Sequence, residues 1–503
     1  MTRSRVCVSI VASVCMTGIL AACGSSAKSS TASSPVSSSK VVTLASDLTL
    51  TTLDPSLSTD AEPLNMIYDP LVVANTAGKI VPDLASSWKI SSNGSVWTFT
   101  LRSGVDFQNG SPVTPADVVS SIKRILADPK SPVTSFVSGI QSVTAVGSNQ
   151  VQLTLKAPNV NLLGDLMFVY IVPQSVYTKL GAQGFAAHPV GSGPYSVVST
   201  VPGLSVTLKA NPHYWAGAPK IQNVLYESIS SETTRISGLE SGSINVTTLT
   251  PVGTKSVKSS SAKVAFKSVS GDGVTYLAFN GGQAPTNNLD FRKAVTYAIN
   301  RPQITSAILS GQAVPWGQML AQPTYGYDPS IPATPYDLAK AKQYLSKSGY
   351  SGQTVPLEYP VGSYVPQADQ IVQVIGAELN AIGIKVKIVG LTFSGFLTDF
   401  FAKTLSGISL FKFTGLNGPG TYSLLNSTAT FSDSTVSSLF TEQAAQTNVT
   451  KQLKELSAID QRYNTMAYYA PLFTDLISYA FTSGVTGVPR ADGFLDAYDM
   501  SIP

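Results

Sequence analysis

Residues 97–118 of the chain read WTFTLRSGVDFQNGSPVTPADV, and this stretch contains a strand pattern followed by a helix pattern. Residues 98–101 alternate polar and apolar side chains, as a half-buried strand does. Residues 110–112 are Gly-Ser-Pro, which favours a turn. A helix is predicted from Pro115, because Thr114 can cap its start and Asp117 lies in its first turn. A strand, a turn and a helix in succession indicate a mixed α/β fold.

The same mixture continues along the chain. Alternating or β-branched runs predict strands at 41–45, 98–101, 151–155 and 206–208. Helical patterns fall at 115–125, 291–298, 337–348, 367–381 and 452–466. Strands and helices that alternate in this way favour α/β over an all-α or all-β body. A length of 503 residues is too great for one ordinary core, so two or three domains are expected.

The N-terminus carries an export pattern. Arg3 and Arg5 precede a mostly apolar run over 6–20, which is too short and too soon followed by polar residues to be a confident membrane span. The run ends in Leu-Ala-Ala before Cys23, which closely resembles a bacterial lipoprotein signal. We therefore predict a signal peptide at 1–22, lipidation of Cys23 and a flexible Ser-rich tether at 23–40. The alternative is an ordinary secretory signal with an incidental cysteine.

Charge and cysteine content narrow the function classes. The net charge is +4, which falls to +2 without Arg3 and Arg5, too little for a nucleic-acid-binding surface. All three cysteines lie at or before residue 23, so the folded body has no disulfide, thiolate cluster or cysteine nucleophile. The two histidines, His188 and His213, are isolated and predict no metal site. No cofactor is expected.

A series of short motifs then follows in one order along almost the whole chain. The motifs occupy 53–55 (LDP), 68–72 (YDPLV), 82–88 (PDLASSW), 97–118, 191–195 (GSGPY), 211–215 (NPHYW), 279–280 (FN), 292–294 (RKA), 297–301 (YAINR), 339–342 (AKAK), 348–350 (SGY) and 382–386 (IGIKV). Together they resemble the extracytoplasmic solute-binding proteins of the oligopeptide, dipeptide and nickel class, family 5. Their tryptophans, Trp88, Trp97 and Trp215, are expected to pack within the protein rather than contact a ligand.

The resemblance implies a periplasmic-binding-protein-like fold of type II, cluster C, with two lobes and an extra inserted domain. Domain I would be discontinuous, with segments 41–58, 187–274 and 480–503. Domain II would be the insertion at 59–186, and domain III would span 275–479. The ligand would lie in a cleft between domains I and III, which close around it by a hinge motion.

The implied function is that of the substrate-binding lipoprotein of an ABC importer. Its partners would be a peptide or other small-molecule ligand, permease and ATPase subunits, and the membrane through the lipid anchor, but no nucleic acid. The protein is expected to be a monomer, anchored outside the cytoplasm, and not an enzyme. One alternative is a ligand sensor with the same fold. A second is a serine hydrolase, because Ser120 and Lys123 match Ser-x-x-Lys, although no Lys-Thr-Gly companion occurs.

The resemblance also places ligand-binding residues. Phe393 takes the position of an aromatic residue that covers the ligand, which suits variable side chains because stacking needs no specific partner. The alternative is that Phe393 is a core residue. The loop formed by Ser58, Thr59 and Asp60 matches the edge that meets the ligand backbone in peptide-binding members, and Phe136 is a candidate for the wall from domain II.

The segment 409–419 departs from the peptide-binding pattern. Where peptide-binding relatives have Trp and, three residues later, an Asp that pairs with the peptide amine, this chain has Thr414 and Asn417. A neutral amide cannot neutralise a buried ammonium group, and Lys412 adds a positive charge. We therefore predict weak binding of free-amine peptides. Neutral or blocked peptides, oligosaccharides or other amide-rich solutes remain candidate ligands.

Overall fold

The computed structural model describes residues 41–58, 62–75, 79–260, 263–322, 324–362, 364–414, 418–487 and 494–502, apart from the side chains of 258–260 and 418–419. The predicted signal peptide at 1–22, Cys23 and the tether at 23–40 lie outside the described residues, so the structure does not test them. Residues from Lys40 to Pro503 form one compact unit.

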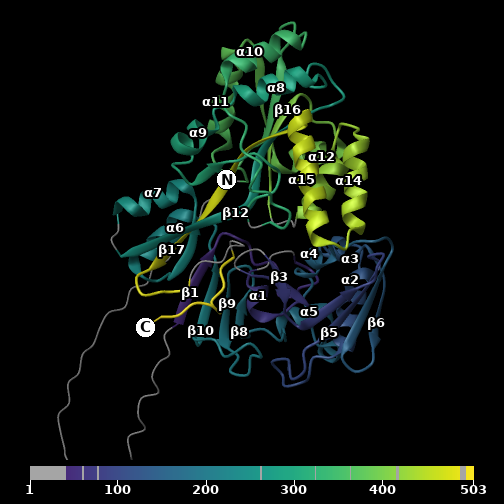
Figure 1. Ribbon diagram of the computed structural model, residues 1–503. Coiled ribbons are helices and arrows are strands. Elements are labelled where there is room, and N and C mark those ends of the chain that lie inside the picture. Colours follow the sequence, from purple (N-terminus) through teal and green to yellow (C-terminus); the bar gives the residue numbers. More distant parts are fainter. Residues whose placement is uncertain are drawn as a thin grey trace, which may run out of the picture. The chain divides into compact units, whose positions relative to one another are not determined.

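One mixed sheet of eleven strands runs through both lobes (Figure 1). Its order is β15-β14-β16-β12-β17-β11-β1-β10-β9-β8, with β13 paired to β17. The strands at one end are β1 (Val41–Ser46), β8 (Tyr195–Val201), β9 (Ser205–Ala210), β10 (Asn223–Ser228) and β11 (Val246–Leu249). Those at the other end are β13 (Ala313–Pro315), β14 (Val355–Pro360), β15 (Val386–Leu391) and β16 (Ile408–Phe413).

Two long antiparallel strands connect the ends of this sheet. They are β12 (Val264–Phe279) and β17 (Tyr469–Thr482). Residues 264–270 of β12 pair with β17 beside β11, whereas residues 274–279 pair with β16 on the other side. The register between the two strands shifts between Ser270 and Val274. Each strand therefore belongs to both lobes, and the shift in register lies at the boundary between the lobes.

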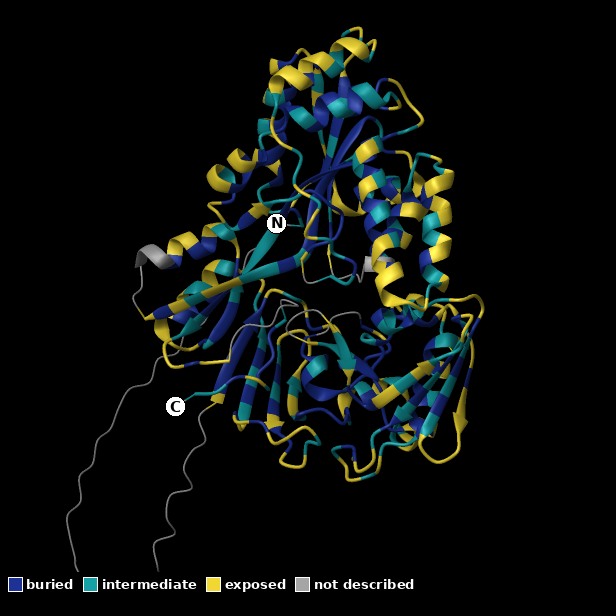
Figure 2. Ribbon diagram, viewed as in Figure 1, coloured by how far each residue is buried: buried dark blue, intermediate teal, exposed yellow. Residues whose placement is uncertain are grey.

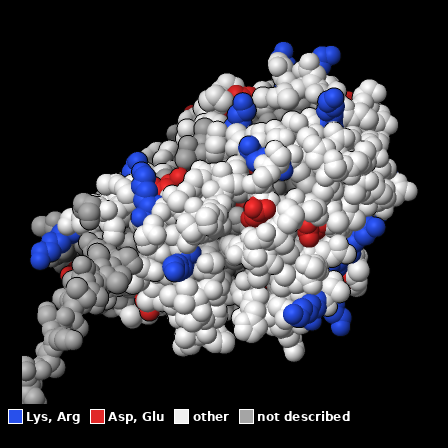
Figure 3. Space-filling view, turned by 90° about the horizontal axis from the view of Figure 1, so that it is seen from below, with Lys and Arg blue, Asp and Glu red and all other residues white. Residues whose placement is uncertain are grey.

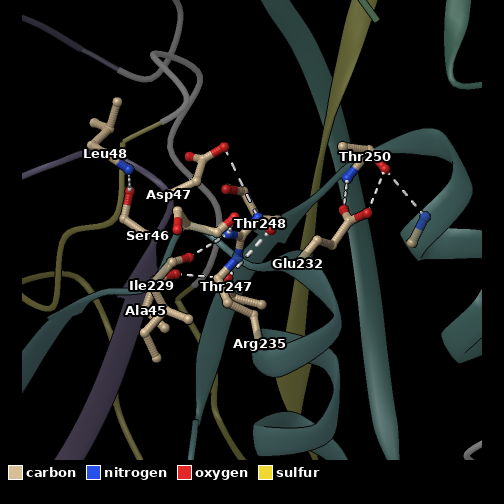
Figure 4. A network of polar contacts seen from close by, with 12 residues as sticks. Ala45, Ser46, Asp47, Leu48, Ile229, Glu232, Arg235, Thr247, Thr248 and Thr250 are labelled. Atoms are coloured by element: carbon tan, nitrogen blue, oxygen red, sulfur yellow. Dashed lines mark hydrogen bonds and ion pairs between the residues drawn. The ribbon is translucent and has the colours of Figure 1, made fainter. Parts of the chain in front are cut away.

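The first lobe has a core built around β1 and β8–β11, with helices α6 (Glu232–Ser241) and α7 (Pro251–Ser260) beside it. Hydrogen bonds join the ends of its strands to α6 and to neighbouring segments (Figure 4). Glu232, at the start of α6, accepts hydrogen bonds from the backbone and hydroxyl of Thr250. Arg235, on the next turn, donates to the carbonyl of Ile229 at 2.6 Å. The Thr247 hydroxyl donates to the carbonyl of Ala45 at 2.6 Å.

The inserted part contains a four-stranded sheet of order β4-β5-β7-β6 and a two-stranded sheet. Its strands are β2 (Val72–Ala74), β3 (Ile80–Pro82), β4 (Ala85–Ile90), β5 (Val96–Leu101), β6 (Ile140–Val146) and β7 (Gln150–Leu155). Its helices are α1 (Leu64–Ile67), α2 (Pro115–Ala127), α3 (Thr134–Val137), α4 (Leu162–Leu166) and α5 (Gln174–Ala187). The start of α2 is a capping box, in which the Asp117 carboxylate accepts from the backbone and hydroxyl of Thr114.

The second lobe surrounds β14–β16 with helices. They are α8 (Leu289–Ala298), α9 (Arg301–Gln303), the π-helical turn η1 (Ile304–Ile308), α10 (Leu338–Lys347), α11 (Ala368–Ala381), α12 (Phe393–Ala402), α13 (Gly418–Thr428), α14 (Ser434–Ala445) and α15 (Val449–Met466). Two cores lie here, one around α8 and α11 and one rich in aromatic residues around α12 and α15. The buried strands and the exposed outer faces of α10 and α15 are visible in Figure 2.

The strands and helices predicted from the sequence are confirmed. Each predicted strand lies within β1, β5, β7 or β9, and each predicted helix overlaps α2, α8, α10, α11 or α15. The domain boundaries remain predictions. In particular, residues 64–68 and Phe185, which the prediction counts with domain II, pack into the core that contains β1 and β8–β11.

Within the described part of the chain, none of the helices combines the length and apolar character needed to cross a bilayer. The face drawn in Figure 3 carries separate Lys and Arg side chains with wide uncharged areas between them. That face therefore presents no continuous basic surface for a polyanion.

Candidate functional site

The point where β12 changes its partners is built from glycines. Residues 271–273, Gly-Asp-Gly, lie within the register shift between β12 and β17. A Cβ at Gly271 would lie 2.9 Å from the carbonyl oxygen of Asp475, and one at Gly273 would lie 2.7 Å from Cε of Lys412. At Gly271 the close atom belongs to the backbone of the neighbouring strand, so its close approach requires glycine there, whereas a side chain at Gly273 would first displace the side chains of Lys412 and Thr414.

A partly buried ion pair lies beside this junction. The Lys412 ammonium on β16 contacts the Asp475 carboxylate on β17, and their side chains are 15% and 16% exposed. Burial acts to lower the pKa of Lys412, but the charges of Asp475 and Asp272 outweigh it, so the pKa of Lys412 is raised. Lys412 is thus a paired cation. Its charge is compensated by a partner 63 residues away in the sequence.

An aromatic surface adjoins the ion pair. Phe393 is the first residue of α12, and Thr392 caps this helix by accepting from the backbone of Gly395 at 3.2 Å. The ring of Phe393 is 39% exposed and lies 4.7 Å from that of Tyr364, between centroids. Tyr364 in turn packs on Phe411 at 5.5 Å. One exposed ring is thereby held in place by a buried aromatic cluster.

Tyr364 connects this aromatic surface to the ion pair. Its hydroxyl donates to the carbonyl oxygen of Lys412 at 3.0 Å and is hydrogen-bonded by the exposed Thr414. Burial raises the pKa of Tyr364, although the hydrogen bond with Thr414 acts to lower it. The Tyr364 hydroxyl is therefore neutral at pH 7. The result is a group of hydroxyls, one compensated ion pair and the nearby Asp272 beside an apolar ring, which suits a solute with both apolar and polar parts.

The inserted part and the second lobe also meet away from the crossing strands. The backbone of Val160 donates to the carbonyl of Ala444 at 2.9 Å. The Asn161 amide donates to Gln443 at 2.9 Å and accepts from Gln452 at 2.5 Å. In the conformation described here, the ends of α14 and α15 are therefore held against the segment before α4 (Figure 1).

Comparison with known proteins identifies the architecture. The sequence pattern of the family "bacterial extracellular solute-binding proteins, family 5 Middle" matches residues 79–435, which is more than half of the chain. The chain belongs to this family.

Its curated relatives bind different solutes. The nickel-binding periplasmic protein of Escherichia coli is 27% identical over 69% of this chain and 71% of its own length. A probable D,D-dipeptide-binding periplasmic protein of the same organism is 29% identical over 67% of each chain. Members of family 5 are extracellular solute-binding proteins, and a further relative, SapA of Escherichia coli, is a probable ABC transporter periplasmic-binding protein.

Solved structures agree on the fold. The structure of HbpA2 from Haemophilus parasuis superposes with a TM-score of 0.82 at 21% identity, over 92% of this chain and 100% of its own. The open, unliganded murein tripeptide-binding protein MppA gives 0.79 at 21% identity, over 93% and 98%. The predicted two-lobed, type II periplasmic-binding-protein fold is thus confirmed.

For this family 5 protein, the structure places five of the eight predicted ligand-binding residues. Phe393, Lys412 and Thr414 come together around Tyr364, as described above. Ser58 is buried, and Phe136 stacks on Phe168 at 5.1 Å. These last two belong to adjacent segments, because the Ser131 hydroxyl donates to the carbonyl of Ser56 at 2.6 Å. Thr59, Asp60 and Asn417 lie outside the described residues.

Three residues of the site were missed by sequence reasoning, namely Tyr364, Asp475 and Asp272. Two features of the sequence could have indicated these aspartates. Asp475 is the only charged residue of β17, whose sequence is YAPLFTDLISYAFT. Asp272 lies between two glycines in an otherwise regular strand pattern. A charge inside an apolar strand needs a partner, and this argument could have directed attention to Asp475.

The structure also describes the residues considered for a serine hydrolase and for a metal site. Lys123 is exposed on α2 and Ser120 is partly buried, whereas the fully buried serine of this helix, Ser121, accepts from the backbone of Val172 at 3.1 Å. His188 and His213 are both exposed. Among the described residues, no three His, Cys, Asp or Glu side chains converge on a point that could hold a metal ion.

Proposed function

We propose that this protein is the substrate-binding lipoprotein of an ABC importer, which captures a peptide-like or other polar solute between domains I and III and delivers it to a membrane permease driven by ATPase subunits. The observation that carries the proposal is that two strands, β12 and β17, run through both lobes with a Gly-Asp-Gly break at the junction. A pair of strands shared by both lobes, with an irregular register at the junction, provides a place about which two lobes can close on a solute.

The aromatic surface and its neighbours define the kind of solute. Phe393 offers an exposed ring, while Tyr364 and Thr414 offer neutral hydroxyls. The pairing of Lys412 with Asp475 leaves that ion pair with no net charge. We therefore propose a ligand with an apolar group against Phe393 and neutral hydrogen-bonding groups beside it, such as a blocked peptide or an oligosaccharide.

The proposed anchor places this binding protein at the outer face of a membrane. The sequence Leu-Ala-Ala before Cys23 and the Ser-rich composition of 23–40 support it, because two acyl chains on Cys23 would hold the protein stably at a bilayer where one would not. A tether of this composition leaves the body free to turn toward a permease.

The test compares two sets of di- to pentapeptides of equal sequence, one with free amines and one N-acetylated, by calorimetric titration. The wild type is expected to bind the acetylated set more tightly. Asn417→Asp should recover part of the free-amine binding, since a hydrogen bond to a charged group contributes about 1.5–3 kcal/mol and a neutral one about 1 kcal/mol.

Native mass spectrometry of the purified protein should in parallel reveal any co-purifying solute. Micromolar binding of free-amine peptides by the wild type would contradict the neutral-ligand proposal and leave a carboxylate such as Asp60 to pair with the amine. A protein that binds no solute of either set and carries none after purification would contradict peptide capture.

A further inference from the structure

A cavity of about 460 Å³ lies between the inserted part and the first lobe. Its lining comes from residues 65–83, 167–170, 194–216 and 494–499. None of the described residues of 275–479, the segment that carries Phe393, Lys412 and Thr414, belongs to this lining. The cavity is therefore distinct from the proposed site between the lobes, and its size is in the range of small-molecule sites.

The charged side chains among the described lining residues of this cavity are carboxylates. Asp69, Asp83, Asp496 and Asp499 line it, and Arg102 is the neighbouring cation. Asp69 accepts hydrogen bonds from the Tyr214 hydroxyl and from Nε1 of Trp215, both at 3.1 Å. Burial nevertheless raises the pKa of Asp69 to about 6. The Asp69 carboxylate therefore has hydrogen-bond donors within the protein.

Asp83 differs from Asp69 in this respect. Its residue is only 5% exposed, and its described hydrogen bonds all use its backbone. Its N–H donates to Leu71 at 3.2 Å, and its carbonyl accepts from Nε of Arg102 at 2.6 Å. No described residue donates a hydrogen bond to the carboxylate, which lines the cavity. A buried carboxylate without donors is costly unless a cation or a donor from a ligand meets it.

The guanidinium of Arg102 does not satisfy this carboxylate. It lies over the Trp215 ring, 4.5 Å from the centroid, and its Nε is occupied by the Asp83 carbonyl. Burial raises the pKa of Asp83 well above its usual value; the charge of Asp69 raises it further, and Arg102 opposes this rise. A ligand cation beside Asp83 would therefore favour the ionised form of this carboxyl group.

The walls of the cavity are aromatic. Tyr214 packs against Trp215 at 5.5 Å and edge-on against Tyr498 at 5.1 Å, and Phe168 and Tyr170 form another part of the wall. Aromatic faces attract cations and at the same time cover apolar groups. The amide of Asn65, whose nitrogen and oxygen are buried without a protein partner, supplies a neutral donor and acceptor at the same cavity.

We propose that this cavity binds a small organic cation, with an ammonium group paired to the Asp83 carboxylate and an apolar or aromatic body against the tyrosines and Phe168. A metal ion fits less well, because no three ligating side chains converge among the described residues. An organic cation satisfies the unpaired carboxylate and the aromatic walls together.

The test uses 2-phenylethylammonium and its neutral analogue 2-phenylethanol, titrated calorimetrically against the purified protein. The wild type should bind the amine at least about tenfold more tightly than the alcohol, because a charge-assisted hydrogen bond exceeds a neutral one by about this factor. Asp83→Asn should abolish that preference and leave alcohol binding unchanged.

Two further variants separate the explanations. Phe393→Ala, in the proposed site between the lobes, should leave amine binding unchanged. Ala74→Leu reduces the space in the cavity without altering its charge and should weaken both probes, which keeps the test valid if Asp83→Asn fails to fold. Equal binding of amine and alcohol, undiminished amine binding by folded Asp83→Asn, or no amine binding by the wild type would each overturn the proposal.

Discussion

Phe393 shows how one exposed side chain can be both ordered and available. Its ring is held by Tyr364 on one side, and 39% of the residue remains open to solvent. A second phenylalanine of the same helix, Phe401, is 56% exposed and packs edge-on against Phe400 at 5.5 Å. The two residues share type, helix and exposure, but only Phe393 lies beside Tyr364, Thr414 and Lys412.

Phe393→Ala is expected to weaken binding of the co-purifying or best-binding solute by roughly 1–3 kcal/mol, as loss of a stacking anchor does. Phe401→Ala is the matched control and should leave affinity unchanged. Calorimetric titration gives the affinities, and thermal unfolding of the ligand-free variants gives their stabilities. A large stability loss with unchanged affinity for Phe393→Ala would identify it as a core residue.

Asp460 is a buried acid at the centre of the aromatic core. It accepts from the backbone of Met319 at 2.9 Å and from the Tyr422 hydroxyl. Burial raises the pKa of Asp460 to about 7, although both hydrogen bonds act to lower it. The folded protein therefore retains a proton that the unfolded chain releases between roughly pH 4 and 7.

This difference sets the sign of a pH effect. Where the folded state binds more protons, stability increases as the pH falls, so the wild type should gain stability between pH 7.5 and 5. Asp460→Asn keeps the shape but cannot titrate, and it should lose much of this gain while matching the wild type near pH 5. Thermal unfolding at several pH values measures the effect, with the exposed Asp106→Asn as the control. Parallel profiles for wild type and Asp460→Asn would show that Asp460 does not bind the extra proton.

At the scale of elements, the end of α14 and the start of α15 form the contact between the second lobe and the inserted part. Gln443 and Gln452 are 1% and 3% exposed, and both bond to Asn161 of the inserted part. Gln452 also accepts from the Tyr325 hydroxyl at 2.7 Å. The two amides also bond to each other, and their contact with Asn161 favours the conformation in which the second lobe touches the inserted part.

Asn161→Ala removes two hydrogen bonds, each worth about 0.5–1.5 kcal/mol, from the contact between the lobes. We expect a shift of the ligand-free protein toward a more open state and weaker solute binding, with little change in thermal stability. Small-angle scattering detects the opening, and Asn149→Ala, in the exposed turn of the same inserted part, is the control. Unchanged scattering and affinity would show that this contact does not influence closure.

At the scale of the whole molecule, the folded body and the N-terminal segment have different tasks. Residues from Lys40 onward form one compact unit with several cores, which stabilise it without any cysteine. The proposed anchor is separate from that body in sequence. Loss of the anchor should therefore change location and leave folding and binding intact.

Cys23→Ser is expected to leave the protein without lipid, either unprocessed or released from the membrane, with unchanged solute binding. Detergent partitioning and the mass of the N-terminal peptide provide the measurements, and the wild type should carry added lipid mass on Cys23. A mature wild-type N-terminus without that mass would refute the anchor.

The sequence by itself determined the elements, the family and the order of the motifs. Patterns such as Thr114 with Asp117 act over a few residues, and local geometry is enough to interpret them. Only the tertiary structure decided which charges are compensated. Lys412 is paired with Asp475 from another strand, the carboxylate of Asp83 is left without a described donor, and burial raises the pKa of Asp460. Desolvation and pairing depend on groups that are far apart in the chain, and no local pattern records them.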